Sequence, residues 1–164
     1  MKSNWFRIVM GAILLCMMTS CNINWRETFV SQPYTAENLL VEISSTEKKY
    51  NLDEPIWIEF SITNLGNETV RVNRLHSPLE GKFTEDYFSI HRKNDPVYYT
   101  GKRLKKRRAI LASTVTLQPG ERVMQCVDVQ EVYSFTNKGK YQVQFRGSRL
   151  NHLPDSEEIE IKVK

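Results

Sequence analysis

The chain has few cysteines and lacks the short motifs of the common catalytic sites. It contains three cysteines, of which Cys16 and Cys21 lie near the amino terminus and Cys126 stands far from both. It has no H-E-x-x-H pair that would bind zinc on a helix, and no G-x-S-x-G turn that would present a serine nucleophile. We therefore expect no catalytic residues, no enzymatic activity and no cofactor. No intramolecular disulfide is expected either, because Cys16 and Cys21 belong to the amino-terminal signal pattern of residues 1–21, which leaves Cys126 alone.

Metal-ligand spacing is also missing. The three histidines, His76, His91 and His152, are too scattered to form a ligand pair. Glu80, Glu85 and Asp86 follow His76 in one loop and offer oxygen ligands, but they lack the D-x-D-x-D-G spacing of calcium loops. A solvated acidic loop is the favoured interpretation, with a small calcium site as the alternative.

Charge of one sign is not in large excess. The chain has 23 Lys and Arg against 19 Asp and Glu, a formal net charge of +4. Lys2 and Arg7 lie in a segment that we expect to be removed, which leaves 23 − 2 = 21 basic against 19 acidic side chains, a net charge of +2. So small an excess argues against nucleic-acid binding by the whole domain.

The basic residues gather in one short segment instead, formed by Lys102, Arg103, Lys105, Lys106, Arg107 and Arg108. Like charges this close repel one another unless they are solvated or matched by anionic groups. Binding to anionic lipid headgroups, to lipopolysaccharide phosphates or to an acidic partner is one interpretation, because each Lys or Arg contributes about 1 kcal/mol at an anionic surface. A solvated loop that keeps a sheet edge from pairing is the alternative.

Residues 1–20 have the pattern of a secretory signal. Basic residues precede a short apolar run, residues 8–18, and two small residues precede Cys21. The run is about half of the roughly 20 residues that a bilayer-spanning helix needs. The Met-Thr-Ser-Cys ending resembles a bacterial lipobox, which implies that Cys21 carries fatty acyl chains such as palmitate and becomes the first mature residue. An ordinary cleaved signal or an uncleaved anchor remains the alternative.

The lipobox resemblance also implies a location. Asn22 rather than Asp follows the cysteine, which in lipoproteins favours the outer membrane. Residues 21–37 are polar, contain Pro33 and show no clear period. We interpret them as the lipidated cysteine and a tether to the domain.

Residues 38–164 read as one all-β domain. Apolar and polar residues alternate in short runs that recur about every 10 residues, with turn residues between them. The pattern predicts strands over 38–44, 55–63, 69–73, 87–91, 97–99, 113–117, 122–129, 141–145 and 157–163. This pattern predicts a single immunoglobulin-like antiparallel β-sandwich of about eight strands.

Turn residues predict how some strands connect. Residues 77–86 form a polar loop before strand 87–91, and Lys93-Asn94-Asp95-Pro96 turns that strand back through 97–99. Residues 64–68 look like a hairpin turn that joins strand 55–63 to strand 69–73. Gln118-Pro119-Gly120-Glu121 is a candidate type II turn, since Gly can hold a positive φ at its third position.

Alternation also predicts the buried faces. Ile56, Ile58, Phe60 and Ile62 share one face of their strand, and Tyr141, Val143 and Phe145 point inward from another. Cys126 is interpreted as a small residue packed in the core, with a reactive thiol as the alternative.

An ordered set of motifs resembles one known family. The set runs Ser77-Pro78-Leu79-Glu80-Gly81, Tyr87-Phe88-Ser89-Ile90, Tyr99-Thr100-Gly101-Lys102, Leu117-Gln118-Pro119-Gly120-Glu121, Val127-Asp128-Val129 and Gly139-Lys140-Tyr141-Gln142-Val143. It is similar to the β-sandwich domain ahead of the zinc catalytic domain in deuterolysin-like peptidyl-Lys metallopeptidases, and covers residues 38–147. The family's zinc ligands have no counterpart here, so the resemblance implies an accessory module and carries over no protease residue.

The sequence as a whole predicts a lipid-anchored binding or assembly module of the bacterial cell envelope, without catalytic activity of its own. Its expected partners are the membrane, through the lipid, and an envelope protein or anionic glycolipid. The alternative is a regulator or inhibitor that binds a peptidase through the loops 77–86 and 101–111.

Overall fold

The computed structural model describes residues 38–102, 113–148 and 150–164. Ten strands form in this part of the chain: β1 (Leu39–Ser45), β2 (Lys49–Tyr50), β3 (Trp57–Asn64), β4 (Val70–Asn73), β5 (Phe88–Arg92), β6 (Asp95–Pro96), β7 (Thr114–Leu117), β8 (Arg122–Asp128), β9 (Gly139–Phe145) and β10 (Ile159–Val163). Two short 3₁₀ helices, η3 (Pro78–Glu80) and η5 (Val129–Glu131), lie in the connections. No helix among the described residues is long and apolar enough to cross a membrane.

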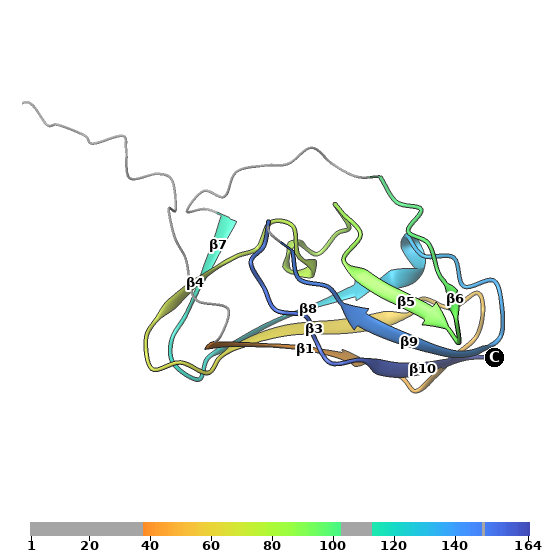
Figure 1. Cartoon of the computed structure of the whole chain (residues 1–164), viewed down its shortest axis with the longest axis horizontal. Coiled ribbons are helices and arrows are strands. Elements are labelled where there is room, and N and C mark those ends of the chain that lie inside the picture. Colours follow the sequence, from red (N-terminus) through yellow and green to blue (C-terminus); the bar gives the residue numbers. More distant parts are fainter. Residues whose placement is uncertain (1–37, 103–112, 149) are drawn as a thin grey trace, which may run out of the picture.

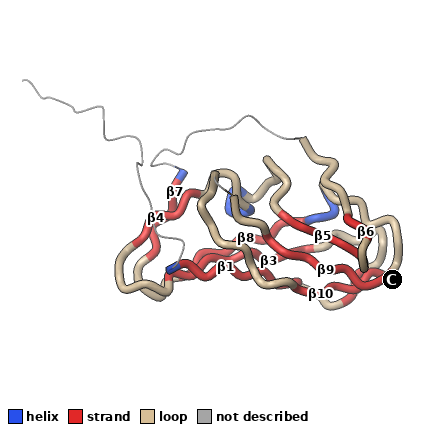
Figure 2. The backbone as a smooth tube through the Cα atoms, viewed as in Figure 1, coloured by secondary structure: helices blue, strands red, loops and turns tan. Residues whose placement is uncertain are grey.

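Two sheets face each other and form a sandwich (Figures 1 and 2). One has the order β1-β3-β8 and the other the order β2-β10-β9-β5-β6. A two-stranded sheet, β4-β7, extends from one end. The all-β sandwich expected from the sequence is confirmed, and eight of the ten strands are at least four residues long.

The connections are immunoglobulin-like. The hydroxyl of Tyr141, at the start of β9, donates a hydrogen bond to the carbonyl oxygen of Asn137 over 2.5 Å, which is the tyrosine corner of such sandwiches. β2 pairs with β10 in parallel, through Lys162 with Lys49 and Val163 with Tyr50. The expectation of purely antiparallel sheets is wrong at this pair. The chain passes from β1 in one sheet to β2 in the other within three residues, so it keeps its direction.

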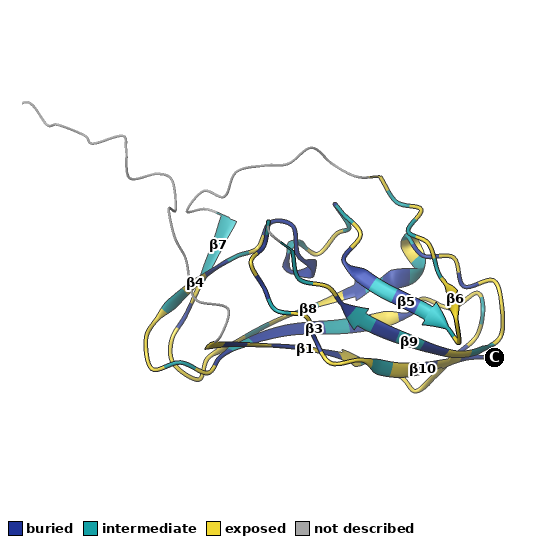
Figure 3. Ribbon diagram, viewed as in Figure 1, coloured by how far each residue is buried: buried dark blue, intermediate teal, exposed yellow. Residues whose placement is uncertain are grey.

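The core lies between the inner faces of the two sheets. In Figure 3 much of β3 and β9 is coloured as buried, whereas β8 and β10 also carry exposed residues. Ile56, Ile58, Phe60 and Ile62 are completely buried, as alternation predicts. Phe60 of one sheet meets Phe145 of the other with ring centroids 4.7 Å apart. Contacts of this kind across the sandwich supply most of the burial that stabilises it.

One predicted hairpin is wrong. β4 pairs with β7, whereas β3 pairs with β1 and β8. The reason lies in Asn64, whose buried amide nitrogen donates to the carbonyl oxygens of Glu68 (2.7 Å) and Leu117 (3.1 Å). These bonds fix the turn and direct the chain towards β7 instead of back along β3. The type II turn after β7 is confirmed by the φ of 78° at Gly120 and by the bond from the Glu121 amide to the Gln118 carbonyl (2.9 Å).

Cys126 is also not where the sequence suggested, because its side chain is exposed. It lies opposite Glu59 on the outer face of the β1-β3-β8 sheet. The alternation of β8 does divide its residues between two faces. However, the buried face is the one that carries Val127.

Candidate functional site

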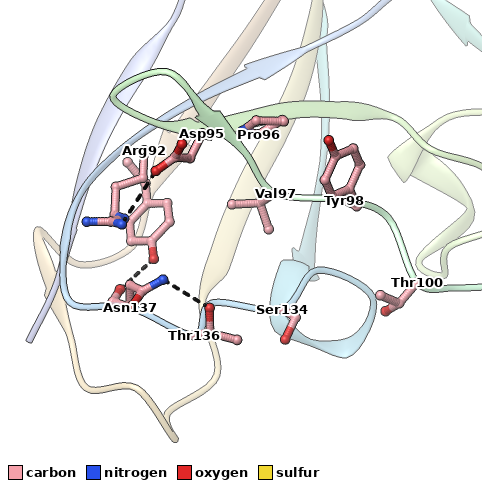
Figure 4. A pocket seen from close by; sticks show the side chains of 10 residues that line it. Arg92, Asp95, Pro96, Val97, Tyr98, Thr100, Ser134, Thr136 and Asn137 are labelled. Carbon is pink, nitrogen blue, oxygen red and sulfur yellow. Dashed lines mark hydrogen bonds and ion pairs between the residues drawn. The ribbon is translucent and has the colours of Figure 1, made fainter.

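A groove opens at one end of the sandwich beside Tyr98. Its walls are residues 95–100, which follow β5, and residues 134–137, which precede β9, and its volume is about 310 Å³ (Figure 4). A second hollow of about 220 Å³ lies next to it and shares Pro96, Val97 and Tyr98 with the first. We call the two hollows together the Tyr98 groove. The Tyr98 side chain between them is 76% exposed.

The hairpin after β5 builds the first wall. β5 turns at Lys93 and Asn94 and pairs with only two residues of β6, after which the amide of Val97 still donates to the carbonyl of Ile90 (2.8 Å). The predicted return strand 97–99 is therefore wrong, because the chain leaves the sheet edge there. The far end of this wall is held by a hydrogen bond from the amide of Thr100 to the carbonyl of Val132, over 2.8 Å.

Tyr133 holds this wall against the body of the protein. Tyr99 forms a β-bridge with Tyr133, and their ring centroids are 5.5 Å apart. The Tyr133 hydroxyl donates to Asp86 Oδ1 (2.6 Å) and accepts the amide hydrogen of Phe88 (3.0 Å). Burial, and then the hydrogen bond to Asp86, raise the pKa of Tyr133 well above its usual range, so it remains a neutral donor.

Replacing Tyr133 with phenylalanine should lower the free energy of unfolding by about 1–3 kcal/mol, because the buried amide of Phe88 loses its acceptor. Urea denaturation measures this loss. Tyr98→Phe is the matched control: it removes a hydroxyl from an exposed ring and should change stability by less than about 0.5 kcal/mol. Equal stabilities of the two variants would show that the Tyr133 hydroxyl does not anchor the wall.

The polar side chains that line the larger hollow include one positive and one negative charge, which pair with each other. Arg92 Nη2 lies 3.6 Å from Asp95 Oδ2 at one end, and the amide nitrogen of Asn137 donates to Thr136 Oγ1 over 3.2 Å. The exposed Ser134 adds a further hydroxyl. In Figure 4, Val97 of the first wall lies across from Ser134 and Thr136 of the second wall, and Tyr98 lies to one side. Such a lining can hold a polar ligand by hydrogen bonds and stack on it with one aromatic ring.

The polar side chains of the acidic loop, residues 76–86, form hydrogen bonds with one another and with its backbone. His76 is buried with its Nδ1 2.8 Å from Glu85 Oε1, while Glu80 Oε2 accepts from the His76 amide (3.1 Å) and from Thr84 Oγ1 (3.0 Å). In residues 38–102, 113–148 and 150–164, no three His, Cys, Asp or Glu side chains are grouped to hold a metal ion. The loop thus uses these residues to fix its own fold.

The other two histidines lie on β5 and in the segment before β10. His91 is on β5, 3.6 Å from Glu158 Oε1, and His152 is exposed. Lys102, the first residue of the basic segment, is exposed and follows Thr100 of the groove by two positions. Cys21, Arg103, Lys105, Lys106, Arg107 and Arg108 lie outside the described residues.

Tyr87, which follows the acidic loop, should make the stability of the folded protein depend on pH. Its hydroxyl is hydrogen-bonded to Thr84, and burial raises its pKa to about 12 from the usual 10. Because the folded state holds this proton more tightly, its stability is complete below pH 10 and is lost as the pH rises towards 12. The melting temperature should therefore fall over this interval. A Tyr87→Phe variant should fall less steeply, and identical slopes would contradict this assignment.

The sequence did contain one signal for the groove. Tyr98 and Tyr99 are adjacent, and alternation sends one ring inward to Tyr133 and the other out to solvent. The second wall, residues 134–137, gave no comparable signal, because its residues are those of an ordinary turn.

Comparisons with known proteins add the following. No family model matches the sequence, and no curated protein matches it significantly. Among solved structures, a β-glucosidase of Erythrobacter marinus is 12% identical, with a TM-score of 0.39 over 77% of this chain and 15% of that chain. A β-glucosidase of Listeria innocua is 17% identical, with a TM-score of 0.39 over 76% of this chain and 16% of that chain.

A CARDB domain from Pyrococcus furiosus is 16% identical, with a TM-score of 0.37 over 82% of this chain and 100% of that domain. Whereas the match covers the whole CARDB domain, it covers only about a sixth of the length of each β-glucosidase. Likeness at this level carries no information on function. The chain's own strand order and tyrosine corner define it as an immunoglobulin-like β-sandwich protein.

Proposed function

We propose that this protein is a lipid-anchored binding module of the bacterial cell envelope, attached to the outer membrane through Cys21, and that it binds its partner through the Tyr98 groove. In this proposal it has no catalytic activity of its own. The observation that carries the proposal is the 76% exposed ring of Tyr98 between two hollows. Binding residues on loops that a rigid sandwich positions are the usual arrangement in such domains.

The place of the groove in the fold supports this proposal. β1 begins at the end of the sandwich that carries β4 and β7, whereas the β5–β6 turn lies at the opposite end (Figure 1). Residues 22–37 are sixteen residues long and reach at most about 55 Å when fully extended. The groove therefore lies at the end of the domain opposite the one at which β1 begins, and a tether of this length leaves it room to face away from the membrane. A ligand in the envelope space could reach it there.

The anchor and the basic segment have separate parts in this proposal. Each buried methylene of an acyl chain contributes about 0.8 kcal/mol, so two or three chains on Cys21 hold the protein stably on a membrane. The basic segment, from Lys102 to Arg108, would add contacts to an anionic glycolipid or an acidic partner. Its first residue, Lys102, follows Thr100 of the groove by two positions in the sequence.

Affinity capture tests the proposal. The full-length protein, extracted in detergent and immobilised, is exposed to an envelope extract at physiological salt. Wild type and the Leu65→Ala control, which alters a 64% exposed side chain outside the groove, should retain the same material. Tyr98→Ala should retain at most about a tenth of it. Equal retention by Tyr98→Ala would overturn the proposal.

A regulator or inhibitor of a peptidase is the second candidate. The loop 77–86 is held rigid by the bonds of Glu80 and Glu85, as an inhibitory loop must be, and Gly81 and Lys82 are exposed at its tip. Pro78, Leu79 and Thr84 are buried, so the loop offers a partner little more than this tip. Inhibition of an envelope peptidase that disappears in a Lys82→Ala variant would replace the first candidate with this one.

A further inference from the structure

We infer that the ligand of the Tyr98 groove is a neutral oligosaccharide, with sugar units lying on both sides of the Tyr98 ring. The inference rests on the proposed function, since it names the chemistry that the same site would recognise. Three features of the groove carry it: its charge balance, its hydrogen-bonding groups and the position of the exposed ring.

The charges in each hollow cancel. The larger hollow contains Arg92 and Asp95, which pair with each other at 3.6 Å. The smaller hollow contains Asp86, which accepts the hydrogen bond of Tyr133, and Arg146. Recognition of a phosphate, sulfate or carboxylate would require an excess of positive charge directed at the ligand. The described walls provide none, so they suit a ligand without net charge.

The hydrogen-bonding groups are of mixed kind. Hydroxyls of Thr100, Ser134 and Thr136 and the amide of Asn137 line the larger hollow, and Ser89 lines the smaller one. Hydroxyl and amide groups both donate and accept. A sugar hydroxyl also does both, and can therefore bond to such a set in several orientations.

The exposed ring provides the third feature. A sugar ring carries an apolar face of C–H groups, and a flat aromatic ring covers such a face with little loss of conformational entropy. Tyr98 lines both hollows, so a ligand that stacks on it can extend into each. At about 310 and 220 Å³, the hollows are at or below the small end for ligand sites. This favours short units on either side of the ring over one bulky ligand.

An extended peptide is the competing occupant. Peptide grooves of sandwich domains use pockets that receive apolar side chains, or a free sheet edge. The edge strand β6 is only two residues long and ends in Pro96, which has no amide hydrogen to donate. The groove therefore offers only a short ladder to an extended peptide, whereas its hydroxyl and amide side chains and the exposed Tyr98 ring fit a sugar chain better.

An array of neutral oligosaccharides tests the inference, with anionic glycans and unmodified peptides printed beside them. The full-length protein in detergent should bind one or more neutral oligosaccharides, at least about 10-fold more tightly than the corresponding monosaccharide, because both hollows are then filled. Tyr98→Ala should weaken this binding about 10-fold or more. Tyr98→Phe, which keeps the ring, should retain more affinity than Tyr98→Ala, and Leu65→Ala, which lies outside the groove, should stay within about two-fold of wild type.

Asn137→Ala is a second variant, which removes a hydrogen-bonding side chain and leaves the Asn137 carbonyl that accepts from Tyr141. It should also weaken binding, with an unchanged melting temperature. Tyr98-dependent binding to peptides, or Tyr98-dependent binding that prefers anionic over neutral glycans, would overturn the assignment of a neutral oligosaccharide and leave the groove as the binding site. Binding that is unaffected by Tyr98→Ala would overturn the groove itself, and with it the proposed function.

Discussion

Replacing Phe60 with alanine is expected to lower the free energy of unfolding by about 3–5 kcal/mol. The Phe60 side chain is completely buried on β3 and meets the ring of Phe145 on β9 at a centroid distance of 4.7 Å. Alanine would leave a cavity between the two sheets, and the cost combines lost transfer free energy with incomplete collapse of that cavity. Urea or guanidinium denaturation of the detergent-extracted chain measures the change.

Leu65→Ala is the control for this core substitution. Leu65 follows β3 directly but is 64% exposed, so its loss should cost less than about 0.5 kcal/mol. A Phe60→Ala variant within 1 kcal/mol of wild type would contradict the arrangement of the two sheets, because Phe60 would then not lie between them.

Gly147→Ala is expected to have an effect of similar size, about 3 kcal/mol or more, by a different cause. A methyl group on Gly147 would lie 1.8 Å from the carbonyl oxygen of Leu153. The clash is with backbone, so a change of rotamer cannot relieve it. Gly147 or the backbone around Leu153 must then move, although the bond from the Gly147 amide to Asp155 Oδ1 (2.7 Å) and the bond from Asn151 Nδ2 to the His76 carbonyl (2.8 Å) oppose such a shift.

Gly66→Ala separates this clash from the general cost of replacing glycine. The nearest atoms to a methyl group on Gly66 are 3.2 Å away, a distance that small side-chain shifts relieve. We expect it to cost less than about 1 kcal/mol. If thermal or chemical denaturation finds the two glycine variants equally stable, the close approach of residues 147 and 153 is wrong.

The buried faces of the sandwich could be predicted from the sequence, since alternation depends only on the two-residue period of a strand. Ile58, Phe60 and Ile62 on β3 and Val143 and Phe145 on β9 illustrate this. The partner of β4 could not, because the turn signal at residues 64–68 is local. The bond that decides the pairing joins Asn64 to Leu117, which is 53 positions away.

Cys126 shows a second limit of sequence patterns. The alternation of β8 separates Cys126 from Val127 correctly, but small and apolar residues lie on both faces. Which face turns inward depends on the opposite sheet and not on β8 alone. A small apolar side chain such as cysteine is therefore a weak indicator of burial.

The candidate site was less accessible to sequence reasoning than the fold. Its walls, residues 95–100 and 134–137, are far apart in the chain, and folding brings them together through the β-bridge of Tyr99 with Tyr133. The basic segment stood out in the sequence because its charges are contiguous. Apart from the exposed Lys102, it lies outside the described residues, and its part in binding stays a prediction.

Photo-crosslinking in living cells tests the central claim most directly. A benzophenone amino acid is placed at position 98 of the full-length chain, or at position 65 as an exposed control outside the groove, and the cells are irradiated. We predict a discrete adduct from position 98 and none from position 65. Absence of an adduct at position 98, or the same adduct from both positions, would contradict the claim that the groove beside Tyr98 is where this protein binds its ligand.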